Sequence, residues 1–124
     1  MTQPGSCILV GEDDPATAEI LTMVLECAGY QVQVRSTAAD VCAALEAQNF
    51  DAALLDMMLS PTTTQEFIGM LAKVPRLPPV IIHSGRPHAE LKVLESRLNA
   101  AAVLQKPASI DALLGSVAVA RKSA

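Results

Sequence analysis

Acidic, hydroxyl and cationic residues follow four short apolar runs in this sequence, and these residues could carry chemistry. Glu12 and Asp13 come after the first such run, Asp56 after another, and Ser84 and Lys106 after two later ones. A short continuous apolar run that ends in a charge is typical of a strand buried in a parallel sheet. Ligands bind at the carboxyl ends of strands in open α/β sheets. We therefore expect these side chains to lie together along one edge of a sheet.

Three carboxylates brought to one edge would repel one another unless a positive charge lay among them. Mg²⁺ suits a few carboxylates together with water and a phosphate. A hydroxyl and an ammonium on the far side would complete a pocket for phosphoryl oxygens. The chemistry that fits is transfer of a phosphoryl group to a carboxylate nucleophile, for which Asp56 is the central candidate, with the metal and Lys106 neutralising the transferred group.

Each of these residues also has a simpler interpretation. Asp56 could cap the helix that follows it, Ser84 before Gly85 could form a turn, and Lys106 before Pro107 could belong to a loop. The convergence of four strand ends favours a site over these separate explanations.

The segments that would position these residues alternate between strand and helix patterns. Strands are predicted at residues 7–11, 31–34, 51–55, 80–83 and 102–105, and helices at 15–28, 38–48, 65–73, 87–99 and from 110 onward. Five strand–helix units with short connections predict one α/β domain, a parallel sheet covered on both faces through right-handed crossovers. The alternating strand at 31–34 is expected at an edge of that sheet.

Helix limits and inward faces can also be predicted. Asp14, Thr37 and Ser109 are placed as N-caps, Pro15 as a first helical residue, and Gly29 as the end of the first helix. The residues expected to share an apolar face are Ile20, Met23, Val24 and Cys27 in the first helix, Val41, Ala44, Leu45 and Gln48 in the second, Leu91, Leu94 and Leu98 in the fourth, and Ile110, Leu113, Leu114 and Val117 in the fifth.

The composition limits the class of protein. A chain of 124 residues that is 51% hydrophobic has the size and apolar content of one globular domain. A net charge of −4 and 2% aromatic residues argue against a nucleic-acid surface. No apolar run is long enough to span a bilayer and residues 1–6 lack the features of a signal peptide, so we expect a cytoplasmic protein. Cys7, Cys27 and Cys42 lack metal-type spacing and are expected to be buried free thiols.

Four segments, in this order, resemble the receiver domain of two-component response regulators: ILVGEDDP at 8–15, LLDMML at 54–59, IIHSG at 81–85 and LQKP at 104–107. The resemblance covers about residues 7–119 and implies a flavodoxin-like, doubly wound (βα)5 fold with strand order 2-1-3-4-5. It implies a phospho-acceptor, Asp56, that is also a direct metal ligand with Asp13, and Glu12 holding the metal through water. The carbonyl of Met58 would be a further ligand, and Ser84 and Lys106 would contact the phosphoryl group. A cis bond is expected between Lys106 and Pro107.

The chain departs from the family pattern in the loops and on the fifth strand. Ser60 and Thr64 stand where many members have proline and glycine, which leaves the shape of the 57–64 loop open. Val103 stands where an aromatic residue is usual. Gly85 replaces a usual alanine and is expected to leave access to Asp56 open.

The resemblance implies a stand-alone, non-enzymatic receiver, one domain over residues 1–124. It would take a phosphoryl group from a histidine kinase or phosphotransfer protein with the help of Mg²⁺. It would then bind a protein partner through the fourth helix, fifth strand and fifth helix. We expect a monomer or weak homodimer that binds neither nucleic acid nor membrane.

Other functions are open to the same sequence. A pseudo-receiver would bind partners without phosphorylation. A small Mg²⁺-dependent phosphatase would need a second acid near the nucleophile, where this chain has Met58, and a flavin site would need a Ser/Thr/Gly-rich loop after the first strand. His83 is expected to be a packed neutral histidine, His88 a solvated residue, and Met57 filler beside the site.

Overall fold

The computed structural model describes residues 6–122, in which five strands and five helices alternate along the chain. Residues 1–5, where no signal peptide is expected, and 123–124 lie outside the described residues. The elements are β1 (Cys7–Gly11), α1 (Pro15–Cys27), β2 (Gln31–Arg35), α2 (Ala38–Ala47), β3 (Ala52–Leu55), α3 (Thr64–Ala72), β4 (Val80–Ser84), α4 (His88–Leu98), β5 (Ala102–Gln105) and α5 (Ile110–Lys122).

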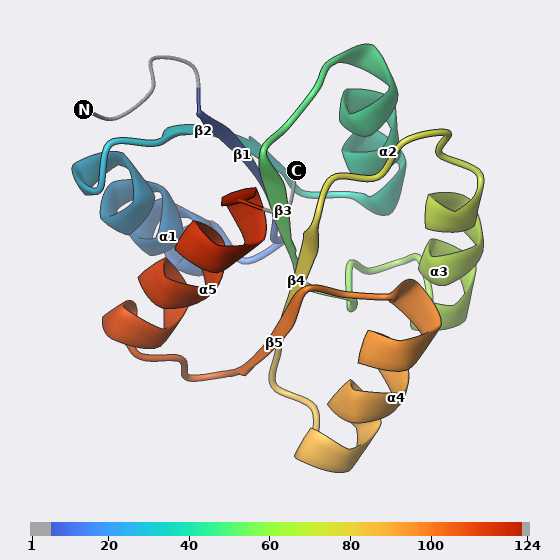
Figure 1. Ribbon diagram of the computed structural model, residues 1–124. Coiled ribbons are helices and arrows are strands. Elements are labelled where there is room, and N and C mark those ends of the chain that lie inside the picture. Colours follow the sequence, from blue (N-terminus) through green and yellow to red (C-terminus); the bar gives the residue numbers. More distant parts are fainter. Residues whose placement is uncertain (1–5, 123–124) are drawn as a thin grey trace.

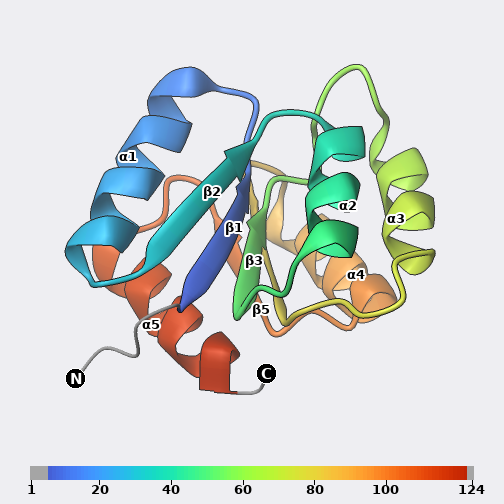
Figure 2. The same ribbon diagram turned by 90° about the horizontal axis from the view of Figure 1, so that it is seen from above.

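The five strands form one parallel sheet in the order β2-β1-β3-β4-β5. Helices α1 and α5 cover one face, and α2, α3 and α4 cover the other (Figures 1 and 2). The chain reverses direction across the sheet after β2, as a doubly wound fold requires. The predicted flavodoxin-like strand order and the edge position of β2 are both confirmed.

The sheet separates two apolar cores, because successive side chains of a strand point to opposite faces. Leu9, Ala53 and Ile82 pack against α2, α3 and α4, together with the fully buried Phe67 of α3. The alternate residues of the same strands pack against α1 and α5, and they include Ile8, Leu54 and Ile81. Strands β1, β3 and β4 are buried along their whole length, so the residues that follow them are carried on rigid supports.

Side-chain caps fix the starts of the helices. Asp14 accepts a hydrogen bond of 3.0 Å from the amide of Thr17, and Pro15 is the first residue of α1, as predicted. Thr37 and Ser109 also accept bonds from backbone amides in the first turns of α2 and α5. Gly29 has a φ of 98°, a left-handed conformation that suits glycine just past the end of α1.

The third helix begins one residue earlier than predicted, at Thr64, because Thr63 and Glu66 form a reciprocal capping box. The third strand begins one residue later than predicted. The carboxylate of Asp51 instead accepts a 2.7 Å bond from the amide of Cys7 and ties the start of β1 to the start of β3.

The predicted inward face of α1 is wrong for three of its four residues, since only Val24 packs against the core. Ile20 and Met23 are 59% and 57% exposed and Cys27 is also exposed, while Ala18, Leu21 and Leu25 are the buried residues. This helix carries apolar residues on two overlapping stripes. The stripe that begins with the small residue Ala18 is the one that packs against the sheet.

Three smaller expectations about burial are also wrong. Ile110, the first residue of α5, is 58% exposed because it lies before the first turn that packs on the sheet. Gln48, at the end of α2, is exposed and donates a hydrogen bond to Gln33 of β2 instead of facing the core. Of the three free thiols, Cys7 and Cys42 are buried as expected and Cys27 is not.

Two proline bonds are cis. The bond between Lys106 and Pro107 is cis as predicted, and the bond between Ser60 and Pro61 is cis as well. Among the described residues, no helix has the length and apolar character that crossing a bilayer requires.

Candidate functional site

The carboxyl ends of β1, β3, β4 and β5 meet along one edge of the sheet. Backbone hydrogen bonds hold these ends in line: the amide of Asp56 donates to the carbonyl of Gly11 at 2.9 Å, and the amide of Lys106 donates to the carbonyl of Ser84 at 2.8 Å. The residues after β1 and β3, and those after β4 and β5, are therefore neighbours in space. This is the placement that the strand pattern of the sequence predicts.

An acidic cluster lies at this edge. Carboxylate oxygens of Glu12, Asp13 and Asp56 lie within 4.8 Å of one another. Glu12 and Asp56 are buried, 2% and 8% exposed, whereas Asp13 is exposed. The cluster is therefore accessible from the side of Asp13, and three oxygen donors at this spacing fit a small, hard divalent cation such as Mg²⁺.

Lys106 supplies the positive charge of the site. Its Nζ donates to Oε1 of Glu12 at 2.8 Å and to Oδ2 of Asp56 at 2.9 Å. Burial by itself lowers the pKa of Lys106, but the hydrogen bonds and charges of Glu12 and Asp56 outweigh burial and raise that pKa above its ordinary value. The side chain is therefore a permanent ammonium at neutral pH that joins the ends of β1, β3 and β5.

The second oxygen of Asp56 is held as well. Oδ1 accepts a hydrogen bond of 2.9 Å from the amide of Met58, two residues further along the chain. With Lys106 on Oδ2, both oxygens of the carboxylate have a donor, so the plane of the group is fixed. The carbonyl of Met58 as a metal ligand stays a prediction.

Ser84 lies at the end of β4 and is completely buried. Its hydroxyl oxygen accepts a hydrogen bond of 3.2 Å from the amide of Arg86. A Cβ added to the next residue, Gly85, would meet no described atom within 4 Å other than those of its own chain neighbours, so the space around Gly85 is open.

Two residues of this edge were not singled out for a role by the sequence. The hydroxyl of Thr64 donates to the carbonyl of Met57 at 2.9 Å and accepts from Nη2 of Arg86 at 3.1 Å. The side chain of Gln105 in turn donates to the carbonyl of Arg86 at 3.0 Å. The sequence pointed to these two residues only through their positions: Arg86 comes two residues after Ser84, and Thr64 stands where glycine is usual.

His83 lies on the other face of β4 and is buried, as expected. It lines a cleft of about 440 Å³ between α1 and α5, together with Lys106. Burial lowers the pKa of His83 to about 4, and the nearby ammonium of Lys106 acts in the same direction against the weaker opposing effect of Asp56. His83 is therefore neutral at physiological pH. His88 is exposed, also as expected.

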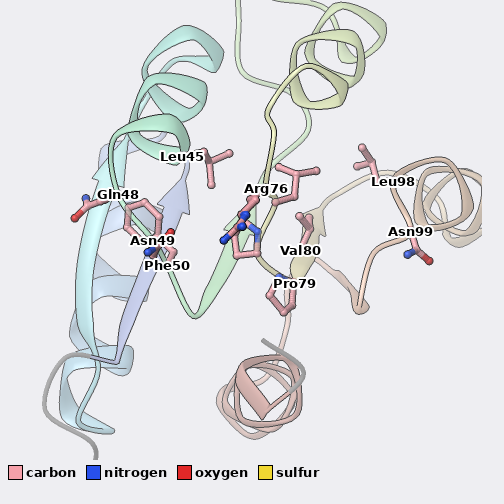
Figure 3. Close-up of a pocket in the computed structure, with 11 residues that line it drawn as sticks. Leu45, Gln48, Asn49, Phe50, Arg76, Pro79, Val80, Leu98 and Asn99 are labelled. Carbon is pink, nitrogen blue, oxygen red and sulfur yellow. The ribbon is translucent and has the colours of Figure 1, made fainter.

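A larger cleft, of about 590 Å³, lies at the opposite edge of the sheet, near the amino ends of β3 and β4 (Figure 3). Its walls come from the end of α2, the segment before β4 and the end of α4, and Arg76 is its one charged residue. None of the residues expected to carry chemistry lines this cleft, so the acidic edge is the candidate site.

Comparison with known proteins agrees with this architecture. Residues 8–118 match the family described as the response regulator receiver domain. The receiver domain of a response regulator from Francisella superposes with a TM-score of 0.85 at 25% identity, over 96% of this chain and 98% of that one. A CheY-like receiver domain protein from Methanospirillum hungatei gives a TM-score of 0.83 at 26% identity, over 96% and 95% of the two chains.

A curated relative is longer than this chain. The sequence is 29% identical over 113 residues to the uncharacterized transcriptional regulatory protein YkoG of Bacillus subtilis, which covers 91% of this chain and 50% of that protein. The chain thus spans about half the length of that relative. Since the family match covers most of the chain and the strand order agrees, the chain belongs to the response regulator receiver domain family of two-component signalling.

Proposed function

We propose that this receiver accepts a phosphoryl group on Asp56 from a histidine kinase or a phosphotransfer protein, and that the phosphorylated form binds a protein partner. The observation that carries the proposal is the setting of the Asp56 carboxylate. It is buried at the end of a central strand, one oxygen is bound by the ammonium of Lys106, and two further carboxylates lie beside it.

In the proposed reaction, a carboxylate oxygen of Asp56 attacks the phosphorus of a phosphohistidine. The P–N bond breaks, its electron pair stays on the imidazole nitrogen, and an acyl phosphate forms on Asp56. Lys106 loses its bond to Oδ2 and turns to an oxygen of the phosphoryl group, while its bond to Glu12 keeps it in place. Ser84 is placed at the neighbouring strand end to donate its hydroxyl to another phosphoryl oxygen.

Glu12, Asp13 and Asp56 are the residues that would hold Mg²⁺. When bound, the ion would offset the negative charge of the three carboxylates and of the incoming phosphoryl group. Without such a cation, Lys106 is the one side chain of residues 6–122 that forms ion pairs with these acids.

The test is incubation with acetyl phosphate and MgCl2 followed by intact mass spectrometry. The protein is expected to gain the mass of one phosphoryl group, and to gain none when EDTA replaces MgCl2. A protein that stays unmodified under these conditions would favour the pseudo-receiver alternative, in which the fold binds partners without phosphorylation.

Asp13→Ala is expected to weaken Mg²⁺ binding by about tenfold or more. Even the loss of a residue that only orients a metal ligand commonly lowers metal affinity by that factor. The matched control is Asp14→Ala. The Asp14 side chain caps α1 through Thr17, and its hydrogen bonds with Thr17 lower its pKa. Asp14→Ala should therefore lower the urea midpoint of unfolding and leave Mg²⁺ affinity nearly unchanged. Equal losses of affinity in the two variants, measured by titration, would show that the metal acids are wrongly assigned.

Activation is expected to move the loop after β4 and the start of α4 more than β5. In a receiver with an aromatic residue on the fifth strand, that side chain turns into the space left by the moving hydroxyl. Val103 is short and stiff at its first torsion, so it cannot make this movement. A phosphoryl group shifts two states only through contacts that differ between them, and these contacts belong here to Ser84 and the residues after it.

Backbone NMR shifts with and without a phosphoryl mimic such as beryllofluoride at Asp56 measure this difference. The largest changes are expected at residues 85–89. Changes centred on Val103 and Leu104, with a quiet loop at 85–89, would contradict the expectation.

A further inference from the structure

The hydroxyl of Thr64 makes two hydrogen bonds that capping of its helix does not require. Thr63 is the N-cap of α3, and its capping box with Glu66 already serves the first amides of the helix. Thr64 instead points back along the chain, where its hydroxyl donates to the carbonyl of Met57 at 2.9 Å. This bond spans seven residues and closes the loop that follows Asp56.

The peptide bound by Thr64 is the same peptide that binds the acceptor. The carbonyl of Met57 and the amide of Met58 belong to one planar unit, and that amide donates to Oδ1 of Asp56 at 2.9 Å. The hydroxyl on the carbonyl side therefore fixes the plane whose N–H holds Asp56. It also polarises the unit, since hydrogen bonds in a chain strengthen one another.

The far end of this chain of bonds is a cation. Nη2 of Arg86 donates to the hydroxyl oxygen of Thr64 at 3.1 Å, and this leaves the hydroxyl proton free for Met57. The side chain of Arg86 is about one-third exposed and its Nη1 lies 3.5 Å from Glu90, a loose ion pair on the surface. The cation at the end of this series of hydrogen bonds therefore lies outside the acidic cluster.

We propose that Thr64 and Arg86 are positioning residues for phosphoryl transfer, acting on Asp56 through the Met57–Met58 peptide. The inference rests on the proposed role of Asp56 as acceptor. This series of hydrogen bonds, from Arg86 through Thr64 and the Met57–Met58 peptide to Oδ1 of Asp56, is called the relay. By holding Oδ1 it stops rotation of the Asp56 carboxylate, so that Oδ2, which faces Lys106, is presented to the phosphorus. Oδ2, bound by Lys106, is thereby the oxygen that reacts, and Oδ1, bound by the Met58 amide, is the oxygen that orients the carboxylate.

The test compares Thr64→Val with Thr64→Ser. Valine keeps the shape of threonine and loses the hydroxyl, while serine keeps the hydroxyl. Thr62→Val is the matched control, because Thr62 lies in the same loop, is half-buried, and its hydroxyl makes no hydrogen bond among the described residues.

The first readout needs neither metal nor phosphodonor. In Thr64→Val the amide proton of Met58 should shift upfield and exchange faster with solvent, because its peptide is no longer polarised or held. Thr64→Ser and Thr62→Val should leave this proton within the range of the wild-type protein.

The second readout is the rate of modification by acetyl phosphate, with Mg²⁺ and the donor saturating for each variant. Loss of one hydrogen bond of ordinary strength predicts a rate about two- to tenfold lower in Thr64→Val. Thr64→Ser should recover most of the rate, and Thr62→Val should keep it. Arg86→Met should lower the rate in the same direction by a smaller factor, and Glu90→Gln, which removes only the ion pair, should not.

A wild-type rate in Thr64→Val, or an unshifted Met58 amide, would overturn the relay. Equal losses in Thr64→Val and Thr62→Val would also overturn it, because they would show general loosening of the loop. Failure of the proposed function is distinguishable: the wild-type protein would then take no phosphoryl group, and the Met58 amide would still report the relay.

Discussion

Asp56→Asn is expected to abolish labelling by acetyl phosphate, with no gain of mass under conditions in which the unaltered protein gains one phosphoryl group. The substitution changes one oxygen for an amide nitrogen and removes the negative charge, so the side chain keeps its shape and loses its nucleophile. No other residue should take over the reaction.

The two neighbouring acids are unsuitable acceptors for different reasons. Glu12 is buried, and its two oxygens accept bonds from Nζ of Lys106 and from the amide of Asp14. Asp13 is exposed at the rim, and none of the described side chains forms an ion pair that would orient it towards a donor. Asp56 and Glu12 share the bond to Lys106, but the side chain of Glu12 is 1% exposed, whereas that of Asp56 is 10% exposed and can be reached by a donor.

Asp111→Asn provides the control, because Asp111 is an exposed acid in the first turn of α5. It should label like the unaltered protein. A labelled Asp56→Asn protein would assign the acceptor elsewhere, and peptide mapping after reduction with borohydride would locate it. Circular dichroism of both variants establishes that the comparison is made on folded protein.

The stability of the protein should fall as the pH is lowered from about 6.5 to 4, and a large part of this loss should come from His83. The pKa of His83 is lowered to about 4 in the folded protein, first by burial and then by Lys106, and its ordinary value in an unfolded chain is 6.5. Between these two values the unfolded chain binds more protons than the folded one. Stability must therefore rise with pH across this window and be lost as the pH falls.

A difference between about 4 and 6.5 corresponds to roughly 3 kcal/mol at the acidic end of the window. This is a large fraction of the 5–15 kcal/mol or so that is typical of a domain. Urea unfolding of the unaltered protein and of His83→Leu at pH 7 and pH 4.5 separates the effect from the titration of carboxylates, which is common to both. The free energy of unfolding should decline less in His83→Leu.

His88→Gln is the control, since His88 is exposed at the start of α4. It should show the same decline as the unaltered protein. Parallel declines in the unaltered protein and His83→Leu would mean that His83 is reached by solvent and protonated without unfolding.

The sequence was sufficient to predict which side chains lie together at the candidate site, because their placement depends on topology. Once the βα units are recognised, residues at the carboxyl ends of the buried strands must lie at the same edge, and Glu12, Asp56, Ser84 and Lys106 do lie there. Strand limits were predicted to within one residue, since a buried strand such as β4, predicted at 80–83 and found at Val80–Ser84, is a continuous apolar run. Their chemical roles, and the single-domain organisation, stay predictions.

The features that sequence could not predict depend on side-chain geometry. In α1, Ile20 and Leu21 are both large and apolar, and only the position of the helix on the sheet decides that the second is buried and the first exposed. The bond from Thr64 to Met57 depends on the path of the 57–64 loop, where the usual proline and glycine are missing. The periodicity of apolar residues in the sequence predicts neither the buried face of α1 nor the bond from Thr64.

The bonds of Lys106 also have a consequence for the order of events during synthesis and folding. They join residues that are 94 and 50 positions apart along the chain, so the site has a high contact order and closes only after β1, β3 and β5 are paired in one sheet. A nascent chain still emerging from the ribosome before Lys106 has the acids and lacks the cation that balances them. Under the proposed function, a chain that ends before Lys106 would lack this ammonium, so we expect it to accept a phosphoryl group only once the sheet is complete.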